Sequence, residues 1–246
     1  MPRKADSSRS IQEEAGATDI SAQNSEAGKK AAKKGLASLD DLARTALKAF
    51  LIARDAAANV PDLFTQSSRM AFLAIKECEQ ELDVIERYID ERTPAAITRV
   101  NEVRARQLLT SLKCTTDLER IGDLVMSMAM RVQARSGKMA VSDVRQLVEM
   151  SEILREMLDL VYRGFVDLDL ERARKVLQMD KDIDRVCHGL FQKHLTAESN
   201  PSSFEVLLMA QALERAGDHT TNLAEDLYSL IEGRSLRHAP KKRAAT

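Results

Sequence analysis

The sequence predicts an all-α protein built as two tandem, pseudo-symmetric three-helix bundles, and three observations support this. The composition favours helices over sheets, since the 246 residues are 44% hydrophobic and only 4% aromatic, with 9 glycines and 5 prolines. Long amphipathic runs are separated by short stretches that contain proline or glycine. A six-residue phrase also occurs twice, as Leu-Glu-Arg-Ile-Gly-Asp at 118–123 and as Leu-Glu-Arg-Ala-Gly-Asp at 213–218.

The helical runs are placed by their apolar periodicity and by the breaks between them. The first three are expected at about 38–60, ending at Pro61, at about 63–91, ending at Thr93-Pro94, and from there to about 135. A break at 136–138 precedes three more runs, at about 141–165, 169–195 and 201–232, the last ending at Gly233. The predicted order is therefore three helices, a joint and three helices.

These breaks divide the chain into four parts. Residues 1–35 are expected to form a disordered N-terminal arm, because they are rich in Ser, Ala, Lys and Glu and lack apolar periodicity. The first bundle is expected over 36–136 and the second over 137–235, with a basic disordered tail over 236–246. Basic tails can contact nucleic acid or anionic lipid, but we interpret these ends as solvated segments and expect no nucleic-acid partner.

Acidic residues recur at helical spacing in both halves. Residues four apart lie above one another on the same helix face. The repeated phrase gives two such lines, Glu119, Asp123 and Ser127 in the first copy and Glu214, Asp218 and Asn222 in the second. The second helix of each half adds a pair, Glu79 and Asp83 in the first and Asp180 and Asp184 in the second. If the second and third helices of each half are adjacent, these acids converge into one patch per half.

Patches of oxygen ligands predict metal sites for hard cations such as Mg²⁺, Mn²⁺, Ca²⁺ or iron. The candidate ligands are Glu79, Asp83, Glu119 and Asp123 in the first patch, and Asp180, Asp184, Glu214, Asp218 and Asn222 in the second. A purely structural explanation stays open. Arg120 and Arg215 each lie three residues before an aspartate and can form intrahelical ion pairs, and the two glycines of the phrase can serve close helix packing.

The sixth run indicates where its acids face. Its apolar seam consists of Val206, Ala210, Leu213, Gly217, Thr220, Ala224, Leu227 and Ile231. At about 100° per residue, Glu214, Asp218 and Asn222 lie on a flank of the helix or on its outside. His219 is interpreted as a flank or packing residue rather than a ligand, because its side chain points about 100° away from Asp218.

Several classes of protein are disfavoured by what the chain lacks. Its three cysteines, Cys78, Cys114 and Cys187, are widely spaced and are interpreted as reduced thiols without chemistry. No run approaches the ~18–20 apolar residues of a membrane span, and the N-terminus lacks the apolar core of a signal peptide, so a cytoplasmic location is expected. No Gly-rich phosphate-binding loop or activated nucleophile is seen, so no enzymatic activity is expected.

Three motifs can be compared with known families: the repeated phrase, Asn222-Leu223-Ala224-Glu225 and Ile231-Glu232-Gly233-Arg234. With these motifs, the chain resembles the PhoU family of phosphate-transport and phosphate-signalling regulators over about residues 38–235. The resemblance implies two tandem three-helix bundles and, as in some members, metal clusters bound through the Glu and Asp of these phrases, with iron, manganese or magnesium as the cofactor. It also implies a negative regulator of the phosphate-starvation response. The partners would be the ATPase of the phosphate ABC transporter and a membrane sensor histidine kinase, with membrane attachment only through these partners.

The sequence departs from the family pattern at a few positions. Ser127 stands where the first copy usually has Asn, Glu79 stands where Asp is common, and the N-terminal arm is long. Two alternatives stay open, a metal-free helical scaffold of a membrane transport complex and a carboxylate-bridged di-iron enzyme. The enzyme would need Glu-x-x-His pairs, and none of the four histidines has a Glu three residues before it. Apolar positions on more than one helix face predict a homodimer.

Overall fold

The computed structural model describes residues 41–65, 68–135, 137–196 and 201–233, and all regular structure within these ranges is helical. A helix over 41–58 is followed by the 3₁₀ turn η1 (Pro61–Phe64), α2 (Ser68–Ile97), α3 (Glu102–Ala134), α4 (Val141–Asp167), α5 (Leu170–Thr196) and α6 (Pro201–Glu232). The all-α prediction of three helices followed by three helices is confirmed. The predicted arm over 1–35 and tail over 236–246 lie outside the described residues.

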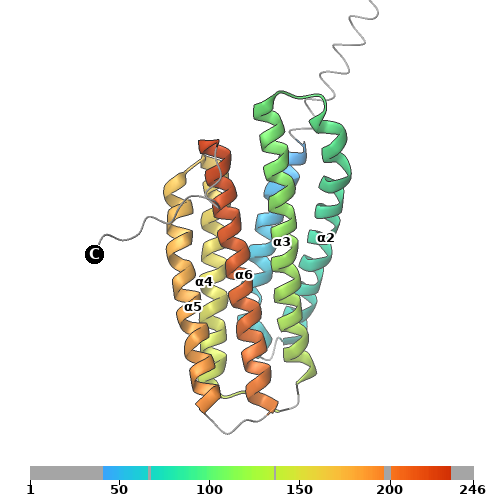
Figure 1. Cartoon of the computed structure of the whole chain (residues 1–246). Helices are drawn as coiled ribbons and strands as arrows, with labels where there is room; N and C mark the ends of the chain where they lie inside the picture. Colours follow the sequence, from blue (N-terminus) through green and yellow to red (C-terminus); the bar gives the residue numbers. More distant parts are fainter. Residues whose placement is uncertain (1–40, 66–67, 136, 197–200, 234–246) are drawn as a thin grey trace, which may run out of the picture. The chain divides into compact units, whose positions relative to one another are not determined.

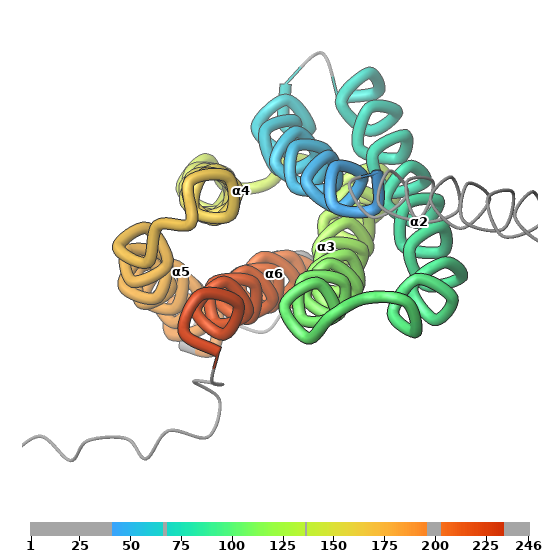
Figure 2. The backbone as a smooth tube through the Cα atoms, turned by 90° about the horizontal axis from the view of Figure 1, so that it is seen from above, coloured from blue at the N-terminus to red at the C-terminus, as the bar shows by residue number. Residues whose placement is uncertain are grey.

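The helices form two groups that meet along α3 and α6. The helix over 41–58, α2 and α3 lie together, and α4, α5 and α6 pack on one another (Figures 1 and 2). The chain direction in Figure 1 shows that α3 and α6 run antiparallel, and they are in extensive contact. The first helix also reaches the second group, since the rings of Phe50 and Phe165 lie 5.2 Å apart between centroids.

The expected end of the second helix is wrong. Proline normally ends or kinks a helix because it lacks an N–H and clashes with the preceding turn. Here α2 continues through Pro94 to Ile97, and the buried hydroxyl of Thr93 donates a hydrogen bond of 2.7 Å to the carbonyl of Ile89. Only one turn follows Pro94, so few backbone hydrogen bonds depend on it. The start of the helix is also later than expected, because Pro61 opens η1 and α2 begins at Ser68.

The helix boundaries at the joints follow the local sequence. The side chain of Asn101 caps α3 by accepting a hydrogen bond of 3.0 Å from the backbone N–H of Arg104. Gly233 follows α6 with φ +74°, the left-handed conformation that the sequence predicts there. The predicted apolar seam of α6 is buried, with Leu213, Ala224 and Leu227 fully inaccessible and Ile231 at its end half-buried.

Both glycines of the repeated phrase lie at close approaches between helices. A Cβ atom at Gly122 on α3 would be 2.6 Å from Cδ1 of Leu82 on α2. A Cβ atom at Gly217 on α6 would be 3.1 Å from Cδ1 of Ile183 on α5. In each half, the third helix therefore meets the second at the glycine that separates the two acids of the phrase, which brings their acidic faces side by side.

Candidate functional site

The first acidic cluster joins the four acids predicted in the first half. Burial raises the pKa of Glu79 on α2, and the charges of Asp83 and Asp123 raise it further. On α3, burial followed by the charge of Asp123 raises the pKa of Glu119 to about 7, with only partial opposition from Arg120. Carboxylates from the two helices are thus close enough to oppose each other's ionisation.

Glu119 is the most enclosed member of this cluster. Its side chain is 15% exposed, and its buried Oε2 atom has no hydrogen-bond partner among the described residues, although Nε of Arg120 lies 3.4 Å away. Arg120 also places Nη1 3.4 Å from Oδ2 of Asp123. The intrahelical ion pair of the structural explanation is therefore present in the first copy, but it leaves an oxygen of Glu119 able to accept a further positive group.

Sequence reasoning missed Glu86, a fifth acid of the first cluster. Its charge contributes to the raised pKa of Glu119, and its Oε1 atom accepts a hydrogen bond of 3.3 Å from the hydroxyl of Thr116. The signal was available, because Glu79, Asp83 and Glu86 continue along one face of α2 at spacings of four and three residues.

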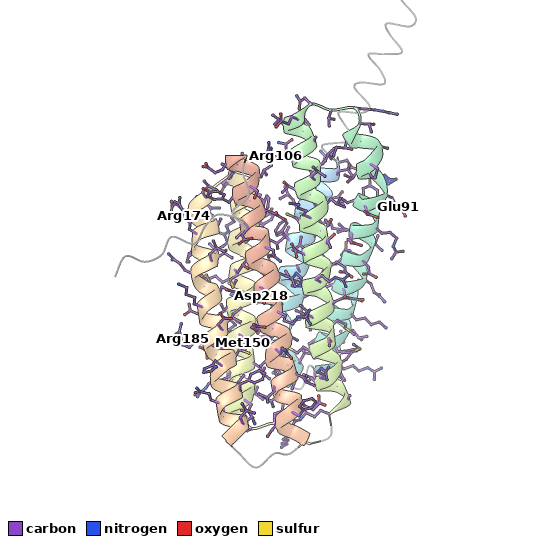
Figure 3. All side chains as sticks on the ribbon, in the orientation of Figure 1. Glu91, Arg106, Met150, Arg174, Arg185 and Asp218 are labelled. Carbon is purple, nitrogen blue, oxygen red and sulfur yellow. The ribbon has the colours of Figure 1, made fainter. Side chains whose placement is uncertain are left out.

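The second acidic cluster lies between α5 and α6. Burial, then the charges of Asp184 and Asp218, raise the pKa of Asp180 to about 6. The pKa of Glu214 is raised by burial and then by Asp218, Asp184 and Asp180, and that of Asp218 by burial and then by Asp184. Figure 3 shows Asp218 near the middle of α6. The structure thus brings together the four acids predicted for the second half.

A thiol belongs to this cluster as well. Burial, followed by the charges of Glu214 and Asp184, raises the pKa of Cys187 to about 11. Cys187 lines an open groove of about 620 Å³. The other lining residues are Asp184, His188, Phe191, Gln192, Leu195 and Glu214. The prediction that the three cysteines are free thiols is confirmed, with Cys114 and Cys187 buried and Cys78 half-buried.

The remaining predicted ligand, Asn222, faces α3. Its Nδ2 atom donates a hydrogen bond of 3.3 Å to Oδ1 of Asp117, and Nδ1 of His219 lies 2.7 Å from the same oxygen. The side chains of Asn222 and His219 therefore contact α3, whereas Asp218 interacts with the acids of α5. For His219 this agrees with the interpretation as a packing residue.

The carboxylates of both clusters match a hard cation in their donor atoms. The first cluster offers carboxylate oxygens, including the buried Oε2 atom of Glu119, for which the described part of the chain supplies no hydrogen-bond partner. As the described side chains stand, no three or more His, Cys, Asp or Glu residues are arranged to hold one metal ion. Like charges favour separated carboxylates when no cation is between them. The residues fit a metal site in composition and proximity, and binding would require their side chains to turn towards a common ion.

Comparison with protein families identifies both halves of the chain. The family model described as the PhoU domain matches residues 46–132 and again residues 147–227. Within the described part of the chain, no helix is long and apolar enough to cross a membrane. The two matches coincide with the two groups of helices in Figure 2.

Similar proteins include the phosphate-specific transport system accessory protein PhoU homologues of Clostridium acetobutylicum and Rhizobium meliloti. The former is 27% identical over 179 residues, covering 70% of this chain and 81% of the relative. The latter is 30% identical over 164 residues, covering 62% and 68%. The crystal structures of PhoU from Pseudomonas aeruginosa and Streptococcus pneumoniae share the fold. Their TM-scores are 0.69 and 0.73, their identities 22% and 19%, and they cover 80% and 82% of this chain and 99% of each solved chain.

Proposed function

The chain belongs to the PhoU family, and on that premise we propose that it is a non-enzymatic regulator of phosphate uptake and of phosphate-starvation signalling. The support is that a PhoU domain matches each half and that the curated relatives carry the name of phosphate-specific transport system accessory proteins. A regulator without catalytic groups acts by binding two states of a partner with different affinity. The proposed partners are the ATPase of the phosphate ABC transporter and a sensor histidine kinase, on the cytoplasmic side of the membrane.

In this proposal the protein restrains the starvation response when phosphate is plentiful. It holds the kinase or the transporter in the state that corresponds to sufficient phosphate. We also propose that it acts as a homodimer, the commonest symmetric assembly of soluble proteins.

The two acidic clusters are proposed to bind metal ions. Glu79, Asp83, Glu119 and Asp123 would hold ions in the first half, and Asp180, Asp184, Glu214 and Asp218 in the second, with Asn222 the least favoured because its amide is engaged by Asp117. A bound divalent cation supplies positive charge that allows these crowded carboxylates to ionise together. The observation that carries the proposal is that acids of two adjacent helices meet in each half. The side chain of Glu119 is only 15% exposed, and Oδ1 of Asp180 on α5 lies 3.7 Å from the Cβ position of Gly217 on α6. Burial and then the neighbouring carboxylates raise the pKa of Glu119 to about 7 and that of Asp180 to about 6, which agrees with this crowding.

One observation favours a metal-free scaffold as the second candidate. Arg120 already contacts Glu119 and Asp123 at 3.4 Å, so part of the negative charge is balanced within α3. In that reading the clusters are only solvated faces of the bundles. Elemental analysis of the purified protein separates the two readings, because the scaffold predicts no bound metal.

Deleting the gene tests the function. We expect starvation genes to be expressed and phosphate uptake to be altered in phosphate-rich medium, because the restraint on the partner is lost. Unchanged expression and unchanged uptake, with no second copy of the gene present, would refute the proposal.

A charge-matched pair of double variants tests the role of the metal. The double variant with Glu214→Ala and Asp218→Ala should fold and should bind less metal. It should also express starvation genes in phosphate-rich medium, as the deletion strain does. Glu149→Ala with Glu152→Ala removes the same charge from exposed positions on α4 and should regulate normally. Normal regulation by the metal-free variant would reduce the acids to a structural role and leave the regulatory proposal intact.

A further inference from the structure

The two acidic clusters differ at one corresponding position. On α2, Glu79, Asp83 and Glu86 are separated by four and three residues. The corresponding residues of α5, at the same spacings, are Asp180, Asp184 and Cys187. The second half therefore has a thiol where the first half has a carboxylate.

The correspondence extends to the neighbours of these residues. In the first half, the charge of Glu86 acts on Glu119. In the second half, Cys187 interacts electrostatically with Glu214, the counterpart of Glu119 in the repeated phrase, and with Asp184. Each side chain thus lies within electrostatic reach of the corresponding acid of the adjacent third helix, Glu119 in the first half and Glu214 in the second.

Cys187 lines the same groove as Asp184 and Glu214, two acids of the cluster. The residue is only 8% exposed, it forms no disulfide, and no hydrogen bond to its sulfur is found among the described residues. The exposed part of Cys187 lies in the groove of about 620 Å³ described above, which Asp184 and Glu214 also line. A nearly buried, unpartnered sulfur beside two carboxylates is a combination of donors that a borderline cation prefers to water.

We propose that Cys187 is a thiolate ligand of the second cluster, which therefore selects a thiophilic divalent cation such as Zn²⁺ or Co²⁺. The first cluster has only oxygen donors and takes harder ions such as Mg²⁺ or Mn²⁺. The inference rests on the metal binding proposed above and adds that the two halves differ in metal preference. Binding displaces the thiol proton to solvent, because a thiolate is the form that ligates a metal.

Cobalt is the probe, because a cobalt–thiolate bond gives a sulfur-to-metal charge-transfer band in the near ultraviolet that carboxylate ligands do not give. The metal-free full-length protein is titrated with Co²⁺ under reducing conditions. We expect the band in the wild type and its disappearance on addition of excess Zn²⁺, which competes for the same site.

The chain provides matched controls. Cys187→Ser should lose the band and bind Zn²⁺ at least about tenfold more weakly, since even residues behind the ligands typically contribute that factor. Cys78→Ser and Cys114→Ser should keep it, because their sulfurs lie on α2 and α3 of the other half. Cys187→Glu installs the residue of the first half, and it should lose the band and still bind Mn²⁺. Circular dichroism shows whether each variant is folded.

The outcomes distinguish this inference from the proposed function. A wild type that retains no cobalt after equilibrium dialysis overturns both the metal sites and the role of Cys187. Cobalt that binds without a sulfur band, or a band that survives in a folded Cys187→Ser variant, overturns only the role of Cys187. If Cys187→Ser does not fold, the Cys187→Glu and the two control variants decide the assignment.

Discussion

The glycines of the repeated phrase allow a quantitative test of the contact between the second and third helices of each half. Replacing glycine by alanine inside a helix stabilises it by about 1 kcal/mol when the methyl group has room. At Gly122 there is no room, because the new Cβ would lie 2.6 Å from Cδ1 of Leu82, a side chain that is 2% exposed. Carbon atoms pack at about 3.5–4.0 Å, so the leucine must move by about 1 Å.

The expected effects of the two substitutions differ in sign. Inserting a methyl group into a packed core costs about 1–3 kcal/mol, so Gly122→Ala should destabilise the protein by up to about 2 kcal/mol. At Gly217 the nearest atom, Cδ1 of Ile183, would be 3.1 Å away and has to give only a few tenths of an ångström. Gly217→Ala should therefore range from neutral to about 1 kcal/mol more stable. Gly217→Ala should therefore be more stable than Gly122→Ala by up to about 3 kcal/mol.

Gly189 on α5 supplies the control. Among the described residues, the only atom within 4 Å of a Cβ there is Nε2 of Gln146, at 3.8 Å. Gly189→Ala should therefore show the helical gain of about 1 kcal/mol without a clash. The assay is urea unfolding followed by circular dichroism, in the presence of a chelator so that metal binding does not contribute. Equal stabilisation by all three substitutions would show that the phrase glycines are not points of close contact.

Two further predictions concern polar side chains. Glu119→Gln should stabilise the protein at pH 8 and leave it unchanged at pH 4 in urea unfolding with chelator. The pKa of Glu119 in the folded protein is about 7, above its ordinary value of 4.5, so ionisation of this side chain lowers the free energy of unfolding. This loss of stability is absent below about pH 4.5, grows as the pH rises and is complete above about pH 7, with an upper bound of about 3 kcal/mol. A pH-independent difference would contradict this. Asp117→Ala removes the carboxylate oxygen that His219 and Asn222 share, and it should lower the free energy of unfolding by about 1–3 kcal/mol in the same assay. An unchanged free energy of unfolding would show that water replaces this contact between α3 and α6.

Much of the fold is predictable because the sequence repeats its own signals. Apolar periodicity placed the helices, and the break at 136–138 separated the halves. Proline was misleading at Pro94, because its effect depends on how much helix follows it, which tertiary contacts decide. Here the second helix extends only three residues beyond Pro94.

The candidate sites were predictable only in part. Helical spacing gives the face of a helix on which an acid lies, and this was sufficient for the four acids predicted in each cluster. It does not say which neighbouring helix a face meets. Asn222 continues the line of Glu214 and Asp218, yet its amide contacts α3, because α6 packs against α3, α4 and α5 at once. Glu86 continues the predicted face of α2 and was within reach of the spacing argument, whereas the significance of Cys187 depends on the relative register of α5 and α6.

The seam between α3 and α6 explains why the two copies of the phrase are alike at some positions and different at others. The shared glutamate, glycine and aspartate face or adjoin the second helix of the same half. The next position differs, with Leu124 in the first copy and His219 in the second. His219 contacts Asp117 across the seam, where Lys113 also approaches the buried Asp226 to 3.5 Å. Positions that serve one half can repeat, whereas positions that join the halves must complement a different surface. The duplication is therefore retained at the two acids and the glycine of the phrase and lost where α3 meets α6.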